Sequence, residues 1–76
     1  MARFYFNTHD GESFFEDEDG LELADPDEAK TEAAKALADM AKDILAKDGS
    51  RKMMVEVLDE GRNILIRSSL QFDFGD

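Results

Sequence analysis

The fold is decided by DPDEAKTEAAKALADMAKDILAKDG, residues 25–49 of the chain. Asp25 suits the N-cap, because its carboxylate can accept from the free amides of the first helical turn, and Pro26 suits the first helical position. Apolar residues then recur at three- and four-residue spacing, which predicts one amphipathic helix over residues 26–47, ended by Gly49. A single helix cannot bury its own apolar stripe, so the flanking segments must supply a layer for it. The stripe consists of Ala29, Ala33, Leu37, Met40, Ala41, Ile44 and Leu45.

The segments on either side of this helix predict two β-hairpins. The first contains an Asp-Gly turn at residues 10–11, and residues 21–23 form a short extended lead-in to the helix. We therefore predict a single α+β domain over residues 1–76 with β-β-α-β-β order. The helix covers one face of a four-stranded antiparallel sheet, in which the strands lie in the spatial order 2-1-3-4. The predicted strands cover residues 3–7, 12–16, 52–58 and 63–74.

Alternation along the strands assigns side chains to the two faces of the sheet. Phe4 and Phe6 are predicted to face the helix, as are Met53, Val55, Val57 and the even-numbered apolar residues of the last strand, beginning with Ile64 and Ile66. The outer face would then be fairly apolar, which predicts a dimer or partner surface. The alternative is that these are scattered exposed apolar residues, as on any soluble protein. The apolar residues assigned to the outer face are Tyr5, Met54, Leu58 and Leu65.

The net charge of −10 is unevenly distributed, because residues 1–30 carry ten acids and two bases whereas residues 31–76 carry nine acids and seven bases. Between Asp10 and Glu28 there are ten carboxylates and no Lys or Arg. Such a surface repels phosphate backbones, so we predict no direct nucleic-acid binding. It either meets a basic partner or is only a solvated surface. Asp17, Glu18 and Asp19 are candidate partner contacts, and the same cluster could bind a divalent cation weakly, although the EF-hand pattern is missing.

Little in the sequence indicates catalysis. There is no cysteine, so there is no disulfide or thiolate chemistry. His9 is the single histidine and is predicted to lie in a turn beside Asp10, with no nucleophile or metal motif near it. No phosphate-binding loop, Ser-His-Asp set or zinc spacing is present, so we expect no enzyme, no catalytic residue, no metal site and no cofactor. No signal peptide and no apolar run of ~20 residues is visible, so we expect a cytoplasmic protein without membrane contact.

Three motifs in order resemble a family of small bacterial proteins of unknown function. They are Arg3-Phe4-Tyr5-Phe6-Asn7, Asp10-Gly11 and Asp19-Gly20-Leu21-Glu22-Leu23 before Asp25. The family opens with an Arg-Tyr-Phe-Phe-Asp-like strand and an Asp-Gly turn, and its acidic Asp-x-x-Gly-x-Glu-Leu-x-Asp segment leads into a single helix. The stretch from Val55 to Arg62 is similar to its second hairpin. The resemblance implies a fold and no activity, and Asn7 stands where an acid is more usual.

A looser similarity is to the N-terminal part of HicB-type antitoxins, where an aromatic strand, an acidic turn, a second strand and an Ala-Glu-rich helix follow in the same order. Those antitoxins mask a toxin by surface contact and carry a separate DNA-binding segment. Residues 1–76 hold no counterpart of that segment, so only the masking role is implied. We expect a non-catalytic protein-interaction module that binds a protein partner or itself. The alternative is an antitoxin- or inhibitor-like acidic protein that masks a basic surface or active site.

Overall fold

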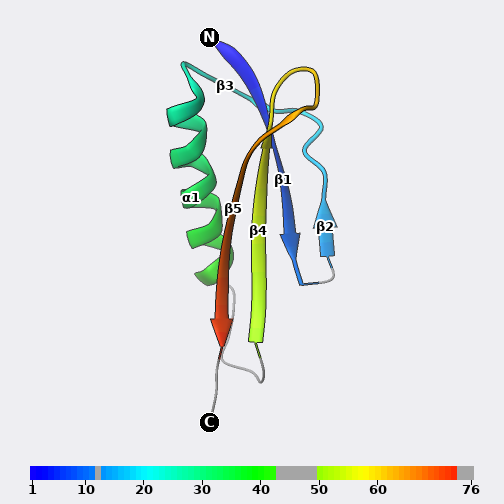
Figure 1. Cartoon of the computed structure of the whole chain (residues 1–76), viewed down its shortest axis with the longest axis vertical. Coiled ribbons are helices and arrows are strands. Elements are labelled where there is room, and N and C mark those ends of the chain that lie inside the picture. Colours follow the sequence, from blue (N-terminus) through cyan, green and yellow to red (C-terminus); the bar gives the residue numbers. More distant parts are fainter. Residues whose placement is uncertain (12, 43–49, 74–76) are drawn as a thin grey trace.

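One helix packs against an antiparallel sheet of five strands in the computed structural model, which describes residues 1–11, 13–42 and 50–73 (Figure 1). In chain order the elements are β1 (Ala2–Asp10), β2 (Ser13–Phe15), β3 (Leu21–Leu23), α1 (Pro26–Lys42), β4 (Ser50–Leu58) and β5 (Ile64–Asp73). The strand order is β2-β1-β4-β5, and β3 also pairs with β1. The predicted α+β class and the predicted order of the four main strands are therefore confirmed.

β1 is the strand on which the first half of the chain is assembled. On one side it pairs with β4 along residues 5–10. On its other side residues 2–4 pair with β3 and residues 8–10 pair with β2, so two short strands share one edge of the sheet. The predicted extended lead-in at residues 21–23 is thus a paired strand, so the sheet has five strands rather than the predicted four.

The strand and helix boundaries differ from the predicted ones in informative ways. β1 runs on to Asp10, three residues past its predicted end, because residues 8–10 are held by β2 on one side and by β4 on the other. The other strands begin and end within two residues of their predicted limits. The helix was predicted to residue 47, and its structure is described through Lys42. Ile44, Leu45, Lys47 and Gly49 lie outside the described residues.

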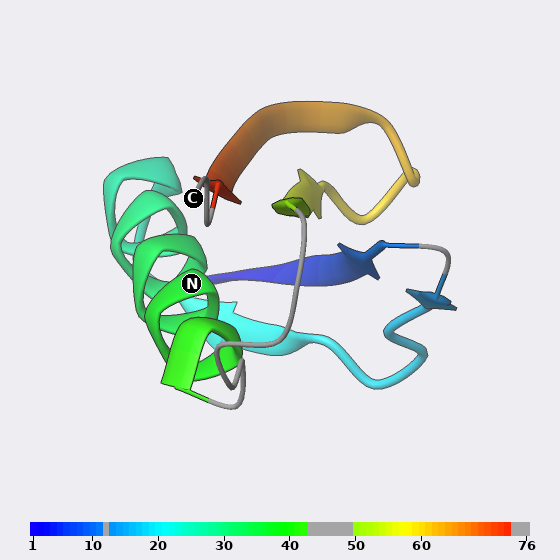
Figure 2. The ribbon, with the colours of Figure 1, turned by 90° about the horizontal axis from the view of Figure 1, so that it is seen from below.

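The helix begins where its capping residue predicts. Asp25 Oδ1 accepts the backbone N–H of Glu28 at 2.9 Å, which confirms Asp25 as the N-cap. Small residues then face the sheet, and neither Ala29 nor Ala33 has exposed surface, so the helix backbone can approach the strands closely. Figure 2 shows the helix on one face of the sheet.

The sheet side of the core follows the predicted alternation. Met53, Val55 and Val57 of β4 are fully buried, and they form one cluster with Phe4, Leu23 and the buried helix residues. Phe6 is partly buried and packs against this cluster. Burial of these side chains is the main source of stability for so small a domain.

The alternation fails at the start of β5. Val57 pairs with Ile66 but Leu58 pairs with Ile64, so Leu65 is an extra residue and forms a β-bulge. Ile64 therefore shares the outer face with Leu58, and the prediction that it faces the core is wrong. Beyond the bulge, Ile66 packs against the core as predicted.

Candidate functional site: the outer face and the two edges of the sheet

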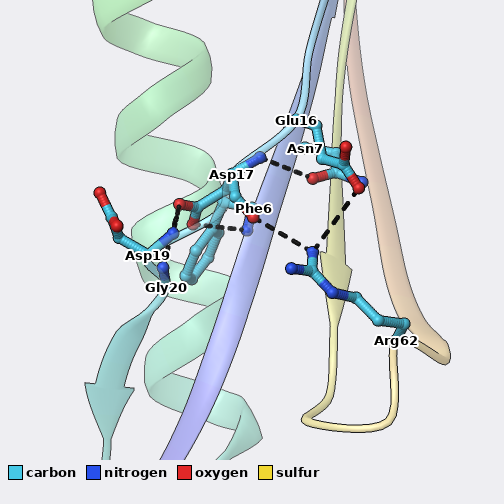
Figure 3. Close-up of polar contacts among 7 residues, drawn as sticks. All are labelled: Phe6, Asn7, Glu16, Asp17, Asp19, Gly20 and Arg62. Atoms are coloured by element: carbon cyan, nitrogen blue, oxygen red, sulfur yellow. Dashed lines mark hydrogen bonds and ion pairs between the residues drawn. The ribbon is translucent and has the colours of Figure 1, made fainter.

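The acidic strap, residues 16–20, runs along β1 in the gap between β2 and β3. Asp17 Oδ2 accepts the N–H of Phe6 at 3.1 Å, and the Asp17 N–H donates to Asn7 Oδ1 at 3.0 Å (Figure 3). Asn7 is buried, and this bond satisfies its side-chain oxygen. The strap thus forms hydrogen bonds with the part of β1 that pairs with neither β2 nor β3, and the Asp17 side chain makes one of them.

The Asp17 carboxylate also accepts hydrogen bonds from within its own strap. Its Oδ1 also accepts the backbone N–H groups of Asp19 at 3.1 Å and Gly20 at 3.0 Å. Partial burial raises the pKa of Asp17, but the N–H donors of Gly20, Phe6 and Asp19 and the charge of Arg62 outweigh burial and lower that pKa below its ordinary value. This arrangement stabilises the charged carboxylate as part of the fold.

Gly20 lets the strap lie against β1. Its φ is +74°, and a Cβ at this position would come within 2.9 Å of Arg3 Cγ and 3.0 Å of both the Phe4 carbonyl oxygen and Tyr5 Cε1. A side chain here would meet backbone as well as side-chain atoms, and the left-handed conformation itself favours glycine. The Asp-x-x-Gly pattern of the sequence therefore has a steric reason.

Two arginines hold the strap from outside. Arg62, in the turn between β4 and β5, lies 4.0 Å above the centroid of the Tyr5 ring. It also donates to the Asp17 carbonyl at 3.1 Å (Figure 3). Its Nη1 is also 3.9 Å from Glu16 Oε2. Arg3 donates to the Asp19 carbonyl at 2.7 Å and pairs with Glu22 at 3.1 Å. The Arg62 contacts join the two hairpins, which are distant in sequence, whereas those of Arg3 lie within the N-terminal half of the chain.

These contacts change the outer face from what alternation predicted. Leu58 lies beside Tyr5 in the sheet register, and only 6% of its surface is exposed. The prediction that Leu58 lies on an uncovered face is therefore wrong, and Tyr5 is half-buried beneath Arg62. Met54 is half-buried and Leu65 is exposed. Whether any of the predicted residues contacts a partner stays a prediction.

His9 lies in β1 rather than in a turn, because β1 continues to Asp10. Its Nε2 is 3.3 Å from Glu56 Oε1, and its ring lies 4.6 Å from that of Phe14. Glu56 Oε2 accepts from Arg67 Nε at 3.3 Å, so the largely buried Glu56 joins side chains from β1 and β5. Alternation along the strands places His9, Glu56 and Arg67 on the outer face, but only the pairing of the distant strands brings them together.

Exposed apolar side chains lie on the edge strands rather than across the outer face of the sheet. Apart from Met1, every exposed large hydrophobic residue in the described part of the chain belongs to β2, β3 or β5. Strand alternation predicts only Leu65 among them as a contact residue. The six edge residues and their exposed fractions are Phe14 52%, Phe15 66%, Leu21 44%, Ile64 45%, Leu65 46% and Leu70 37%.

The described residues hold no group of three or more His, Asp or Glu side chains placed to bind a metal ion. In the predicted acidic cluster, Glu18 and Asp19 are exposed, whereas Asp17 accepts three backbone hydrogen bonds. No helix in the described part of the chain has both the length and the apolar character to cross a membrane.

The fold and the strap define a small α+β domain in which one helix covers a five-stranded antiparallel sheet. The chain belongs to the family DUF6894, a domain of unknown function, whose profile matches residues 3–71. The resemblance found in the sequence to a family of unknown function is thus confirmed, and it supplies no activity. No curated protein and no solved structure matches the chain significantly.

Proposed function

We propose that this domain is a non-catalytic protein-interaction module that associates through the edges of its sheet. The observation that carries the proposal is the concentration of exposed apolar side chains on β2, β3 and β5. An edge strand offers unpaired backbone donors and acceptors beside its side chains. A partner strand can therefore gain main-chain hydrogen bonds and apolar contacts at once.

This proposal moves the contact surface from the outer face to the edges. Leu58 is buried and Tyr5 lies beneath Arg62, so neither offers a free apolar surface. Leu65 keeps its proposed role, because it lies on β5 and is exposed. Met54 lies next to His9 on the outer face and is a secondary contact at most.

The test compares edge variants with a helix variant. Phe15→Ser and Leu65→Ser each remove one exposed apolar side chain from opposite edges, and Ala34→Ser is the control on the exposed side of the helix. Tagged wild-type and variant domains are incubated with lysate of the native host, cross-linked and quantified by mass spectrometry. We expect the wild-type domain to capture a stoichiometric amount of another protein or of the untagged domain. This capture should fall with at least one edge variant and should be unchanged with Ala34→Ser. Capture that is absent, or equal for all four proteins, contradicts the proposal.

A second candidate function is favoured by the exposed acids around the strap and the start of the helix. These are Glu16, Glu18, Asp19, Glu22, Asp25, Asp27 and Glu28. They suit an antitoxin- or inhibitor-like role in which the domain masks a basic surface or active site. Such binding weakens steeply between 0.1 and 1 M salt, because the screening length falls from about 10 to about 3 Å. Association that is unchanged over this range contradicts the masking role and fits apolar edge contacts.

A further inference from the structure

β5 is a long and continuous edge. Among the described residues it pairs with β4 alone, and Figure 2 shows no ribbon beyond it. The strand has ten residues, without proline or glycine, and its register with β4 is unbroken after the bulge at Leu65. Its free side therefore presents a row of backbone groups that another extended strand can pair. The opposite edge consists of two three-residue strands separated by the strap.

Charge distinguishes the two edges as sites for a second copy. Residues 50–73 contain four acids and four bases, whereas residues 1–30 carry a net charge of −8. Pairing through β5 brings two neutral hairpins together and leaves the acidic segments at the far ends of the joined sheet. Pairing through β2 and β3 would set two strongly acidic segments side by side, which repulsion opposes. The charged residues of the neutral hairpin are Arg51, Lys52, Glu56, Asp59, Glu60, Arg62, Arg67 and Asp73.

Two-fold symmetry limits how two β5 strands can pair. An axis normal to the sheet keeps each face on its own side, so a residue on the axis pairs with its own copy. An axis at Arg67 would place two arginines directly opposite each other, which is unfavourable. An axis at Ser69 or Leu70 avoids this, and it places the two copies of Leu70 diagonally or directly opposite each other. Leu70 pairs with the buried Met53, so it lies on the helix side and is 37% exposed.

We infer that β5 binds the β5 of a second copy of this chain in antiparallel orientation, so that two sheets join into one with both helices on the same face. The inference rests on the proposed function and names its partner. The apolar contact at the centre is made by the two copies of Leu70, and the backbone of residues 66–73 provides the hydrogen bonds.

A pair of matched variants tests this inference. Leu70→Lys and Leu21→Lys are the same change at similarly exposed residues on opposite edges. Sedimentation equilibrium should give the wild type a mass of twice 8.5 kDa. Leu70→Lys should weaken dimerisation by about tenfold or more, because two ammonium groups meet at the axis. Leu21→Lys should dimerise like the wild type.

Hydrogen exchange of the wild type provides a measurement that needs no variant. Backbone amides of β5 should become more protected as protein concentration rises, and those of β2 should not. A wild type that stays monomeric, or a dimer lost in Leu21→Lys and kept in Leu70→Lys, overturns the inference. A monomeric wild type that still captures another protein through an edge overturns only the second-copy partner. A wild type that neither dimerises nor captures any protein overturns both the inference and the proposed function.

Discussion

The two edges of this sheet differ in how they treat the backbone hydrogen-bonding groups that an edge strand leaves unpaired. At the β2–β3 edge the backbone of β1 is satisfied by two short strands and, between them, by the carboxylate of Asp17. At the other edge β5 runs for ten residues and pairs only with β4 among the described residues. The acidic strap and the two short strands cover that side of β1, which we call the closed edge, whereas the far side of β5 pairs with no strand among the described residues and is the available edge.

This difference separates the determinants of stability from those of association. The closed edge depends on a few exact contacts of Asp17, Gly20 and Arg62, so single substitutions there should destabilise the fold. β5 depends on main-chain pairing and on core residues shared with β4, so substitutions of its exposed side chains should change association more than folding.

The largest effect is expected for Gly20→Ala. The new Cβ would meet the Phe4 carbonyl at 3.0 Å in a backbone with positive φ, so we expect a loss of about 3 kcal/mol in the free energy of unfolding. Gly11→Ala is the control, because Gly11 also has positive φ but open space around its Cβ position. It should cost about 1 kcal/mol in urea denaturation. Equal losses would contradict the close approach of the strap to β1.

Asp17→Ala should follow, with a loss of about 2 kcal/mol. It leaves the N–H groups of Phe6, Asp19 and Gly20 without their acceptor, and the partial exposure of the strap lowers the cost of each lost bond. Asp17→Asn keeps one side-chain oxygen and should lose less. If neither variant changes the urea midpoint, the carboxylate does not close this edge.

The loss of stability in Asp17→Ala should depend on pH. The pKa of Asp17 is lower in the folded chain than in the unfolded one, so its charge stabilises the fold above the unfolded pKa of about 3.9. That contribution is lost as the pH falls through the folded pKa. The stability difference between wild type and Asp17→Ala should therefore be constant near neutral pH and shrink below about pH 4.

Much of the fold could be predicted because its signals are local or periodic. The cap at Asp25, the apolar helix stripe as far as Ala41 and the alternation through Met53, Val55 and Val57 are confirmed, and they define the core. If every pair of neighbouring strands is antiparallel, two hairpins joined by one helix can be arranged in only a few strand orders. The order of the main strands could therefore be predicted as well.

The candidate site could not be predicted in the same way, because it depends on contacts between distant segments. Alternation along a strand cannot reveal a bulge, so it predicts the wrong face for Ile64. Nothing local shows that Arg62 reaches Tyr5 or that Leu58 is buried. The local sequence predicts a turn at His9, because its pairing with both β2 and β4 is a property of the whole sheet.

Substitutions of Arg62 should change the free energy of unfolding less, and two of them distinguish the contribution of its side chain from the strain of its backbone. Arg62→Ala removes the contact with the Tyr5 ring and the bond to Asp17, and we expect a loss of about 1 kcal/mol. Arg62→Gly loses the same contacts but relieves the positive φ of 67°, so its stability should lie close to that of the wild type. If both variants lose the same amount, the backbone at this turn carries no strain.

The smallest effect is expected at β5, for Arg67→Ala. The Arg67 side chain is 63% exposed, so water screens its charge although Glu56 is largely buried, and its removal should cost no more than about 0.5 kcal/mol. Glu56 also keeps its contact with His9, so the carboxylate is not left alone. The small loss should disappear in 1 M salt, where exposed ion pairs are screened. A loss as large as that of Asp17→Ala would mean that side-chain bonds hold both edges, and the contrast between a closed edge and an available one would fail.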